Sequence, residues 1–190
     1  MNRTLTGLLL TAVAAIACSN ARAELTFYDN LAAWQSASGP TTKLGFDDLP
    51  QYTVLSTQYE SQGITFGFGD PDVINYIPGS FEDGWGFDGN CIVDMHLTQP
   101  ISAFAATIPG GAMFQFYLGG QLVGQMGFFV DQFAGFTSDL AFDRVLMKPP
   151  LAPPPFCDEV FVDDIYFQTI PAPGAGALLG VVLFGSRRRR

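Results

Sequence analysis

Large apolar residues alternate with polar ones in many short segments of this chain, and turns rich in Gly or Pro separate these segments. Alternation puts every second side chain on the same face of an extended strand, so it predicts strands that bury one face. The expected strands cover residues 24–28, 42–46, 64–68, 91–97, 101–108, 112–118, 121–130, 135–137, 140–147 and 159–168. Short strands at regular spacing, with 18 phenylalanines for a core, predict an all-β protein, an antiparallel two-sheet β-sandwich of jelly-roll type.

Residues 30–38 are the one segment with helical spacing. Leu31 and Trp34 lie three residues apart, as on one face of a helix. Asp29 is placed to cap the first turn, and Gly39 and Pro40 mark the end. The sequence therefore predicts one short N-terminal helix, with Trp34 as its anchor in the core.

The first 23 residues predict a secretory signal peptide. Arg3 precedes an apolar stretch at 8–17, and Ala21 and Ala23 occupy the two positions that signal peptidase reads. Cleavage after Ala23 would release an exported chain. An alternative is a lipoprotein signal that ends at Cys18, which follows a run of small and apolar residues.

The last 22 residues divide into a proline break, an uncharged run at 174–186 and a basic end. Residues 170–186 cover roughly 25 Å as a helix, the lower limit for crossing a bilayer core. Terminal arginines stay on the cytoplasmic side of such a helix. We therefore expect a signal peptide at 1–23, a β-sandwich ectodomain at 24–168 and a tail with a single membrane helix at 169–190. The tail residues that carry this prediction are Pro171, Ala172, Pro173, Arg187, Arg188, Arg189 and Arg190.

This tail resembles the PEP-CTERM sorting signal of Gram-negative bacteria that make extracellular polysaccharide. Besides the signal peptidase expected at the N-terminus, the resemblance implies a second processing partner, the membrane cysteine protease exosortase, which would recognise the Pro171-Ala172-Pro173 motif and cut there. It also implies a tether to the inner membrane, followed by delivery to the cell surface or the extracellular space. Ala172 stands where the family has Glu, so a variant protease or a retained tail anchor is the alternative. The motifs FDDLP at 46–50 and GITF at 63–66 resemble the opening of β-sandwich domains that precede such tails.

Charge limits the partners of the ectodomain. All 18 acidic residues lie in it, against three basic ones, Lys43, Arg144 and Lys148, which leaves a formal charge of −15. Phosphate backbones and anionic lipids need the opposite sign, so nucleic acid is excluded as a partner. The two ectodomain cysteines, Cys91 and Cys157, predict a disulfide in an exported chain, and two free buried thiols are the alternative.

Aromatic rings and carboxylates alternate in the Gly-rich segment 69–90, which we expect to be a long loop or an irregular hairpin. Rings stack on the apolar faces of sugars and carboxylates bind sugar hydroxyls, so this segment is a candidate site for an extracellular polysaccharide. A loop held in place by packed aromatics is the alternative. The candidate ligand-binding residues are Tyr76, Asp83, Trp85 and Asp88.

Two acidic pairs, Asp47–Asp48 and Asp163–Asp164, fall at the first and last core strands. Resemblance to carbohydrate-binding modules implies that such carboxylates could hold a structural calcium ion, which prefers oxygen ligands. A solvated acidic surface explains the same residues. No EF-hand spacing is present.

No catalytic motif is found: the chain has no GxSxG, HExxH or GxxxxGK[ST], and His96 is the single histidine. We therefore expect an exported, non-enzymatic glycan-binding or structural module. A polysaccharide-acting hydrolase with two carboxylates is the alternative.

Overall fold

A computed structural model describes residues 22–67, 71–75, 85–129, 132–149 and 159–169. These residues form eleven strands, one α-helix and one turn of 3-10 helix. The elements are β1 (Leu25–Tyr28), α1 (Leu31–Ser38), β2 (Thr41–Leu44), η1 (Glu60–Gln62), β3 (Ile64–Phe66), β4 (Asp72–Asn75), β5 (Trp85–Asn90), β6 (Val93–Ile108), β7 (Gly111–Leu118), β8 (Gln121–Phe129), β9 (Gln132–Lys148), β10 (Glu159–Val162) and β11 (Ile165–Gln168).

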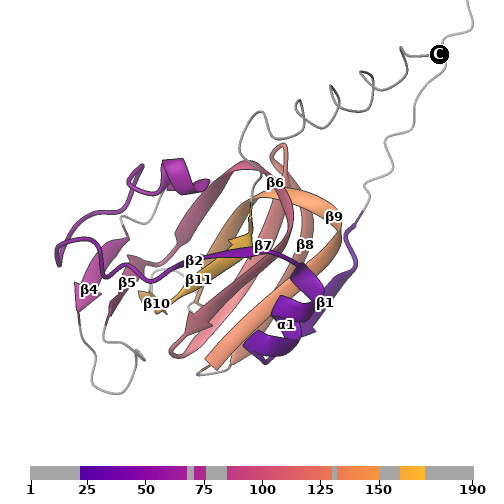
Figure 1. The fold of residues 1–190 in the computed structure, drawn as a ribbon, viewed down its shortest axis with the longest axis horizontal. Coiled ribbons are helices and arrows are strands. Elements are labelled where there is room, and N and C mark those ends of the chain that lie inside the picture. Colours follow the sequence, from indigo (N-terminus) through magenta and orange to yellow (C-terminus); the bar gives the residue numbers. More distant parts are fainter. Residues whose placement is uncertain (1–21, 68–70, 76–84, 130–131, 150–158, 170–190) are drawn as a thin grey trace, which may run out of the picture.

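The strands form two antiparallel sheets arranged as in a sandwich (Figure 1). The large sheet has the order β2-β11-β6-β9-β7-β8, with β1 paired to β9 and β3 paired to β6. The small sheet has the order β10-β5-β4 and lies at the end of the molecule opposite α1. The expected all-β, antiparallel architecture is therefore confirmed.

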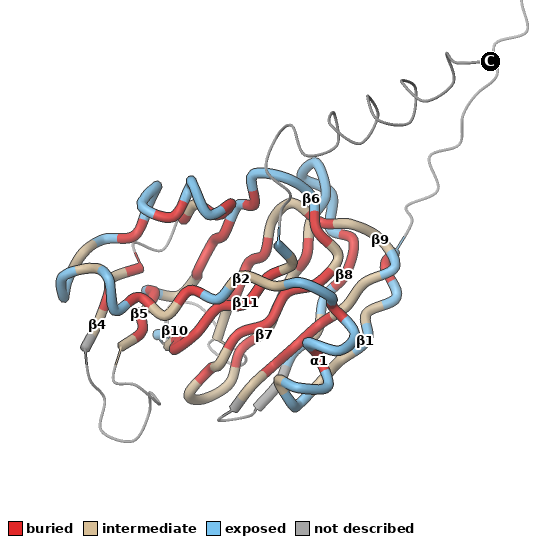
Figure 2. Tube along the Cα trace, viewed as in Figure 1, coloured by how far each residue is buried: buried red, intermediate tan, exposed pale blue. Residues whose placement is uncertain are grey.

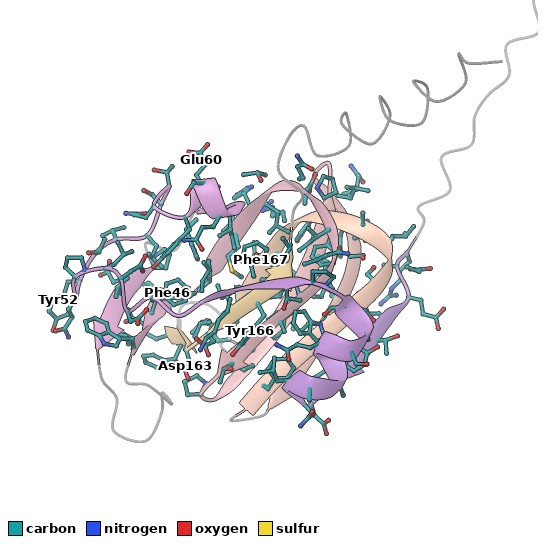
Figure 3. All side chains as sticks on the ribbon, viewed as in Figure 1. Phe46, Tyr52, Glu60, Asp163, Tyr166 and Phe167 are labelled. Atoms are coloured by element: carbon teal, nitrogen blue, oxygen red, sulfur yellow. The ribbon has the colours of Figure 1, made fainter. Side chains whose placement is uncertain are left out.

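Phenylalanine fills the core between the sheets. Phe87 of the small sheet has its ring centroid 5.6 Å from that of Phe66 on β3 of the large sheet. It lies 4.9 Å from the ring centroid of Phe46, which follows β2. A second group on the large sheet includes Phe114 and Phe136, whose ring centroids lie 4.7 Å apart. Figure 2 shows the buried residues along these strands, and Figure 3 shows Phe46 and Phe167 inside the sandwich while Tyr52 and Glu60 lie at its rim.

The two longest strands were each expected as two shorter ones. Residues 93–97 of the first predicted strand and residues 101–108 of the next belong to one strand, β6, and residues 135–137 and 140–147 belong to another, β9. The register between them shifts from His96 to Ile101 and again to Ala103. These shifts change which side chains face the core, so the break in alternation resembled a turn in the sequence.

The reverse error occurs near the C-terminal end of the described chain. The sequence predicted one strand at 159–168, but β10 pairs with β5 in the small sheet and β11 pairs with β2 and β6 in the large sheet. The chain changes sheet at Asp163 and Asp164, both of which are buried. The change also alters the phase of alternation, so Val162 and Ile165 face the same core.

Helix α1 covers part of the outer face of the large sheet, the face directed away from the core between the sheets. Trp34 is fully buried against Tyr166, Ala103 and Ala105, and its Nε1 donates to the carbonyl of Phe136 at 3.0 Å. The cap differs from the prediction, because the side chain of Asn30, and not that of Asp29, accepts from Ala33 N. Asn30 is extended and directly precedes the helix, which is the geometry that an N-cap requires.

Both predicted processing segments lie mostly outside the described residues. The residues outside include Cys18, Ala21 and residues 170–190 of the predicted tail, so signal cleavage, sorting and the membrane helix stay predictions. In the described part of the chain, no helix is long and apolar enough to cross a membrane.

Candidate functional site

The aromatic and acidic segment is partly described. Strands β4 and β5 pair antiparallel, so its ends form a hairpin, while Tyr76 and Asp83 lie outside the described residues. Trp85 is half-buried and packs against the core, on the same side of β5 as Phe87. Asp88 lies three positions along the strand and therefore faces the opposite side. The structure does not bring Trp85 and Asp88 together on one surface.

Asp88 shares its side of the small sheet with other carboxylates. Asp72 on β4 is its register partner. Glu159 on β10 is the register partner of Asn90, which lies two positions after Asp88 on β5. Burial, followed by the negative charges of Glu159 and Asp72, raises the pKa of Asp88. The raised pKa of Asp88 therefore reflects its burial first and the repulsion among these carboxylates second.

The predicted calcium ligands divide between two environments. Asp48 accepts a hydrogen bond from the hydroxyl of buried Tyr59, and burial followed by this bond raises the pKa of Tyr59. Asp47 is exposed, and Asp163 and Asp164 are buried. A Cβ on Gly45 would lie 3.4 Å from Asp164 Oδ1 and 3.8 Å from Asp47 Oδ1, so the two pairs do approach each other there.

Asp164 already has a cation beside it. Lys43 Nζ lies 2.7 Å from Asp164 Oδ2, and the Tyr166 hydroxyl donates to the same oxygen at 2.9 Å. Lys43 and Tyr166 are register partners on β2 and β11, which positions all three groups. Within the described ranges no three metal-ligating side chains are grouped to hold an ion, and calcium binding stays a prediction.

Cys91 lies in the connection between β5 and β6 and takes part in a disulfide. Cys157 lies outside the described residues. The pair Cys91–Cys157 therefore stays a prediction.

A polar network that the sequence did not predict occupies the outer face of the large sheet. Asp94 on β6 is 1% exposed, and both of its carboxylate oxygens bind Arg144 on β9, through Nε at 2.7 Å and Nη2 at 2.8 Å. His96 Nε2 lies 3.3 Å from Asp94 Oδ2. The hydrogen bond to Asp94 raises the pKa of Arg144. A bidentate pair of this kind fixes the guanidinium in one orientation.

The network continues across the next two strands. The Arg144 guanidinium lies 5.2 Å from the centre of the Tyr117 ring on β7. The Tyr117 hydroxyl donates to Gln115 Oε1 at 3.1 Å, and Gln115 Nε2 donates to Gln125 Oε1 on β8 at 3.2 Å. We call these six residues the outer-face network: Asp94, His96, Arg144, Tyr117, Gln115 and Gln125.

Two glycines lie close to this network, one against Asp94 and one in the turn that follows β7. Gly67 faces Asp94, and a Cβ there would lie 3.2 Å from both Asp94 Oδ2 and His96 Nε2, so a side chain would disturb their contact. Gly119, in the turn between β7 and β8, has a φ of 55° and donates its N–H to Asp143 Oδ2 at 2.9 Å. This bond ties the β7–β8 turn to β9.

The outer-face network combines donors and acceptors that can reach solvent. The side chain of His96 is 48% exposed and that of Arg144 is 30% exposed. Arg144 uses two of its five N–H donors on Asp94, and Gln125 is exposed. Amides, a guanidinium and an aromatic ring on one face of a sheet can bind hydroxyl groups.

The sequence held one local signal for this network. Asp94 and His96 alternate with Val93, Met95 and Leu97, and Gln115 and Tyr117 alternate with Phe114 and Phe116, which places the polar residues on outer faces. Their meeting could not be predicted, because Asp94 and Arg144 are 50 positions apart and join only through the β6–β9 register.

The fold and the network define an all-β protein with two antiparallel sheets in a sandwich-like arrangement and a polar outer face. No protein-family model and no curated protein sequence matches the chain. Among solved structures, a mutant of a family 29 carbohydrate-binding module, solved to probe ligand recognition, is similar at 15% identity and a TM-score of 0.29. The match covers 77% of this chain and 91% of that chain.

Proposed function

We propose that this protein is an exported, non-enzymatic module that binds a glycan through its outer-face network. Its ectodomain would be a sandwich of jelly-roll type, and its PEP-CTERM-like tail would deliver it to the cell surface or the extracellular matrix. The observation that carries the binding role is the network itself. Hydrogen bonds and one cation–π contact join its side chains across four neighbouring strands on the outer face.

Preorganisation supports this role. Arg144 is held by two bonds to a buried carboxylate, and Tyr117 and Gln115 are joined by a hydrogen bond. Side chains that are ordered before binding lose less conformational entropy when a ligand arrives. The charge of the ectodomain also favours a neutral partner, because 18 acidic residues repel polyanions.

The test is retention of the mature ectodomain on a panel of immobilised neutral and acidic polysaccharides. We expect retention on a neutral polysaccharide and a loss of about five- to tenfold in affinity for Gln125→Ala, equivalent to one hydrogen bond of about 1 kcal/mol or slightly more. Gln125 is exposed and leaves no buried charge behind when it is truncated.

The matched control is Gln99→Ala, an exposed glutamine on β6 that is not part of the network. It should bind like the wild type. A folded ectodomain that binds no polysaccharide of the panel would refute the proposal and leave a purely structural surface protein.

A further inference from the structure

Five residues on the outer face form one line across the large sheet. Thr65 on β3 is the register partner of His96 on β6, and His96 is the partner of Arg144 on β9. Arg144 is the partner of Tyr117 on β7, and Tyr117 is the partner of Leu122 on β8. Register partners lie side by side on the same face of a sheet. We call this line the cross-strand row.

The cross-strand row is long and reaches solvent along its length. Four intervals between strands of about 4.8 Å give a length of roughly 19 Å. His96 and Leu122 are exposed, and Thr65, Arg144 and Tyr117 are partly exposed. Each position of the row carries a different chemical group: in order, a hydroxyl, an imidazole, a guanidinium, a phenol and an aliphatic side chain.

The next row along the strands is buried on β6 and β9 and reaches solvent again at Gln125 on β8, beside the Leu122 end of the cross-strand row. Asp94 and Leu146 are register partners and are buried beside the cross-strand row, and Gly67 bonds through its N–H to the carbonyl of Asp94 at 2.7 Å. A side chain is missing at Gly67 altogether. On β6 and β9, the side chains that reach solvent on this part of the face are therefore those of the cross-strand row.

We propose that the ligand is an unbranched neutral glycan that lies across the strands along the cross-strand row. This inference rests on the proposed function and names its ligand class. A pyranose ring is about as long as the spacing of neighbouring strands, so successive sugars can meet successive side chains. Hydroxyls donate and accept, which suits Thr65, His96 and Tyr117, and the Arg144 donors bind ring or hydroxyl oxygens.

One end of the cross-strand row is open in the described part of the sheet, because Leu122 lies on β8, which ends the order of the large sheet. At the other end the chain before η1 lies beside β3, since Phe66 donates its N–H to the carbonyl of Ser56 at 2.7 Å. A polymer can therefore extend past the Leu122 end of the row.

The test is calorimetric titration of the mature ectodomain with two oligosaccharide series, cellobiose to cellohexaose and maltose to maltohexaose. In one series, affinity should rise with each added sugar up to about four sugars and then level off, because the row spans about four strand intervals. Constant affinity from the disaccharide upward, or binding in neither series, would overturn the proposal.

A variant at one end of the row separates this proposal from general glycan binding. Leu122→Ala should weaken binding of the hexaose about threefold or more while leaving the disaccharide unchanged, since it removes apolar contact at one end only. Thr98→Ala, at an exposed position on β6 outside the row, is the control. If the polysaccharide panel shows binding but neither length nor Leu122→Ala matters, the cross-strand row is wrong and the proposed function stands. If nothing binds, both fail.

Discussion

Asp94 is the residue on which the outer-face network depends. It is a buried carboxylate in the middle of a sheet, and a charge in that position needs a partner. Arg144 supplies two hydrogen bonds to it and remains 30% exposed itself. The two members of the pair are therefore unequal, because water can solvate Arg144 but has little access to Asp94.

This inequality predicts unequal costs of substitution. Arg144→Met leaves the buried Asp94 without its cation and should lower the free energy of unfolding by about 3–5 kcal/mol. Asp94→Asn leaves a partly exposed guanidinium and should cost clearly less. Urea unfolding of both variants measures the difference, and equal costs would show that the burial of Asp94 does not set the energetics of the pair.

Asp88 offers a prediction that depends on pH. Burial and the charges of Glu159 and Asp72 raise its pKa above the ordinary value of 3.8. The folded protein therefore binds the Asp88 proton more tightly than the unfolded chain, so this carboxyl contributes stability below pH 3.8 and the contribution is lost as pH rises through the folded pKa. Asp88→Asn should thus raise the melting temperature at pH 7.

The gain from Asp88→Asn should disappear at pH 3, where the wild-type carboxyl is protonated as well. Thermal unfolding at both pH values measures this. Asp29→Asn, at an exposed position before α1, serves as the comparison and should change little. A gain of equal size at pH 3 and pH 7 would contradict the electrostatic origin.

Among the elements, α1 shows how the outer face is divided. The helix packs where β9 carries Gly135, and a Cβ at that position would lie 2.7 Å from Trp34 Cδ1 and 2.8 Å from Phe133 Cε1. The Trp34 ring can therefore lie directly on the strand because Gly135 has no side chain. The other half of the outer face is left for the polar network.

Gly135→Ala should accordingly destabilise the protein by about 1–3 kcal/mol, the usual cost of overpacking a core. Gly127→Ala on β8 is the matched control, because a Cβ there would meet its nearest neighbour, Met113, only at 3.9 Å. It should be neutral or slightly stabilising. Chemical denaturation compares the two variants, and a neutral Gly135→Ala would mean that α1 can move away from the strand at no cost.

For the molecule as a whole, the proposed export rests on its two ends. Ala23, the last residue of the expected signal peptide, is buried in the structure and donates its N–H to the carbonyl of Val123 at 2.6 Å. The next residue, Glu24, donates its N–H to Asp139 Oδ1 at 2.7 Å. Cleavage after Ala23 would remove the first contact and place the new terminal ammonium beside a carboxylate.

Intact mass of the protein from membrane and extracellular fractions of its host tests both ends. We expect a released species that begins at Glu24 and ends between Pro171 and Pro173. A membrane-bound species that retains Arg190 would show a plain tail anchor, and one that begins at Cys18 with added acyl mass would show a lipoprotein.

Local patterns were sufficient for much of the architecture. The alternation of apolar residues predicted antiparallel strands, among them those at 112–118 and 121–130, and the spacing of Leu31 and Trp34 predicted α1. Each of these depends on residues that are close in the chain, because strand and helix periodicity act over a few positions.

Contacts between distant strands decided the rest. β6 and β9 stay paired through two register shifts, so each is one strand although its alternation breaks. The chain changes sheet at Asp163 and Asp164, so β10 and β11 lie in different sheets. The same pairing brought Asp94 to Arg144 and set Trp85 and Asp88 on opposite faces of β5. The amino-acid sequence alone does not show the register between strands that are far apart in the chain. That register depends on how the side chains of the whole core pack together.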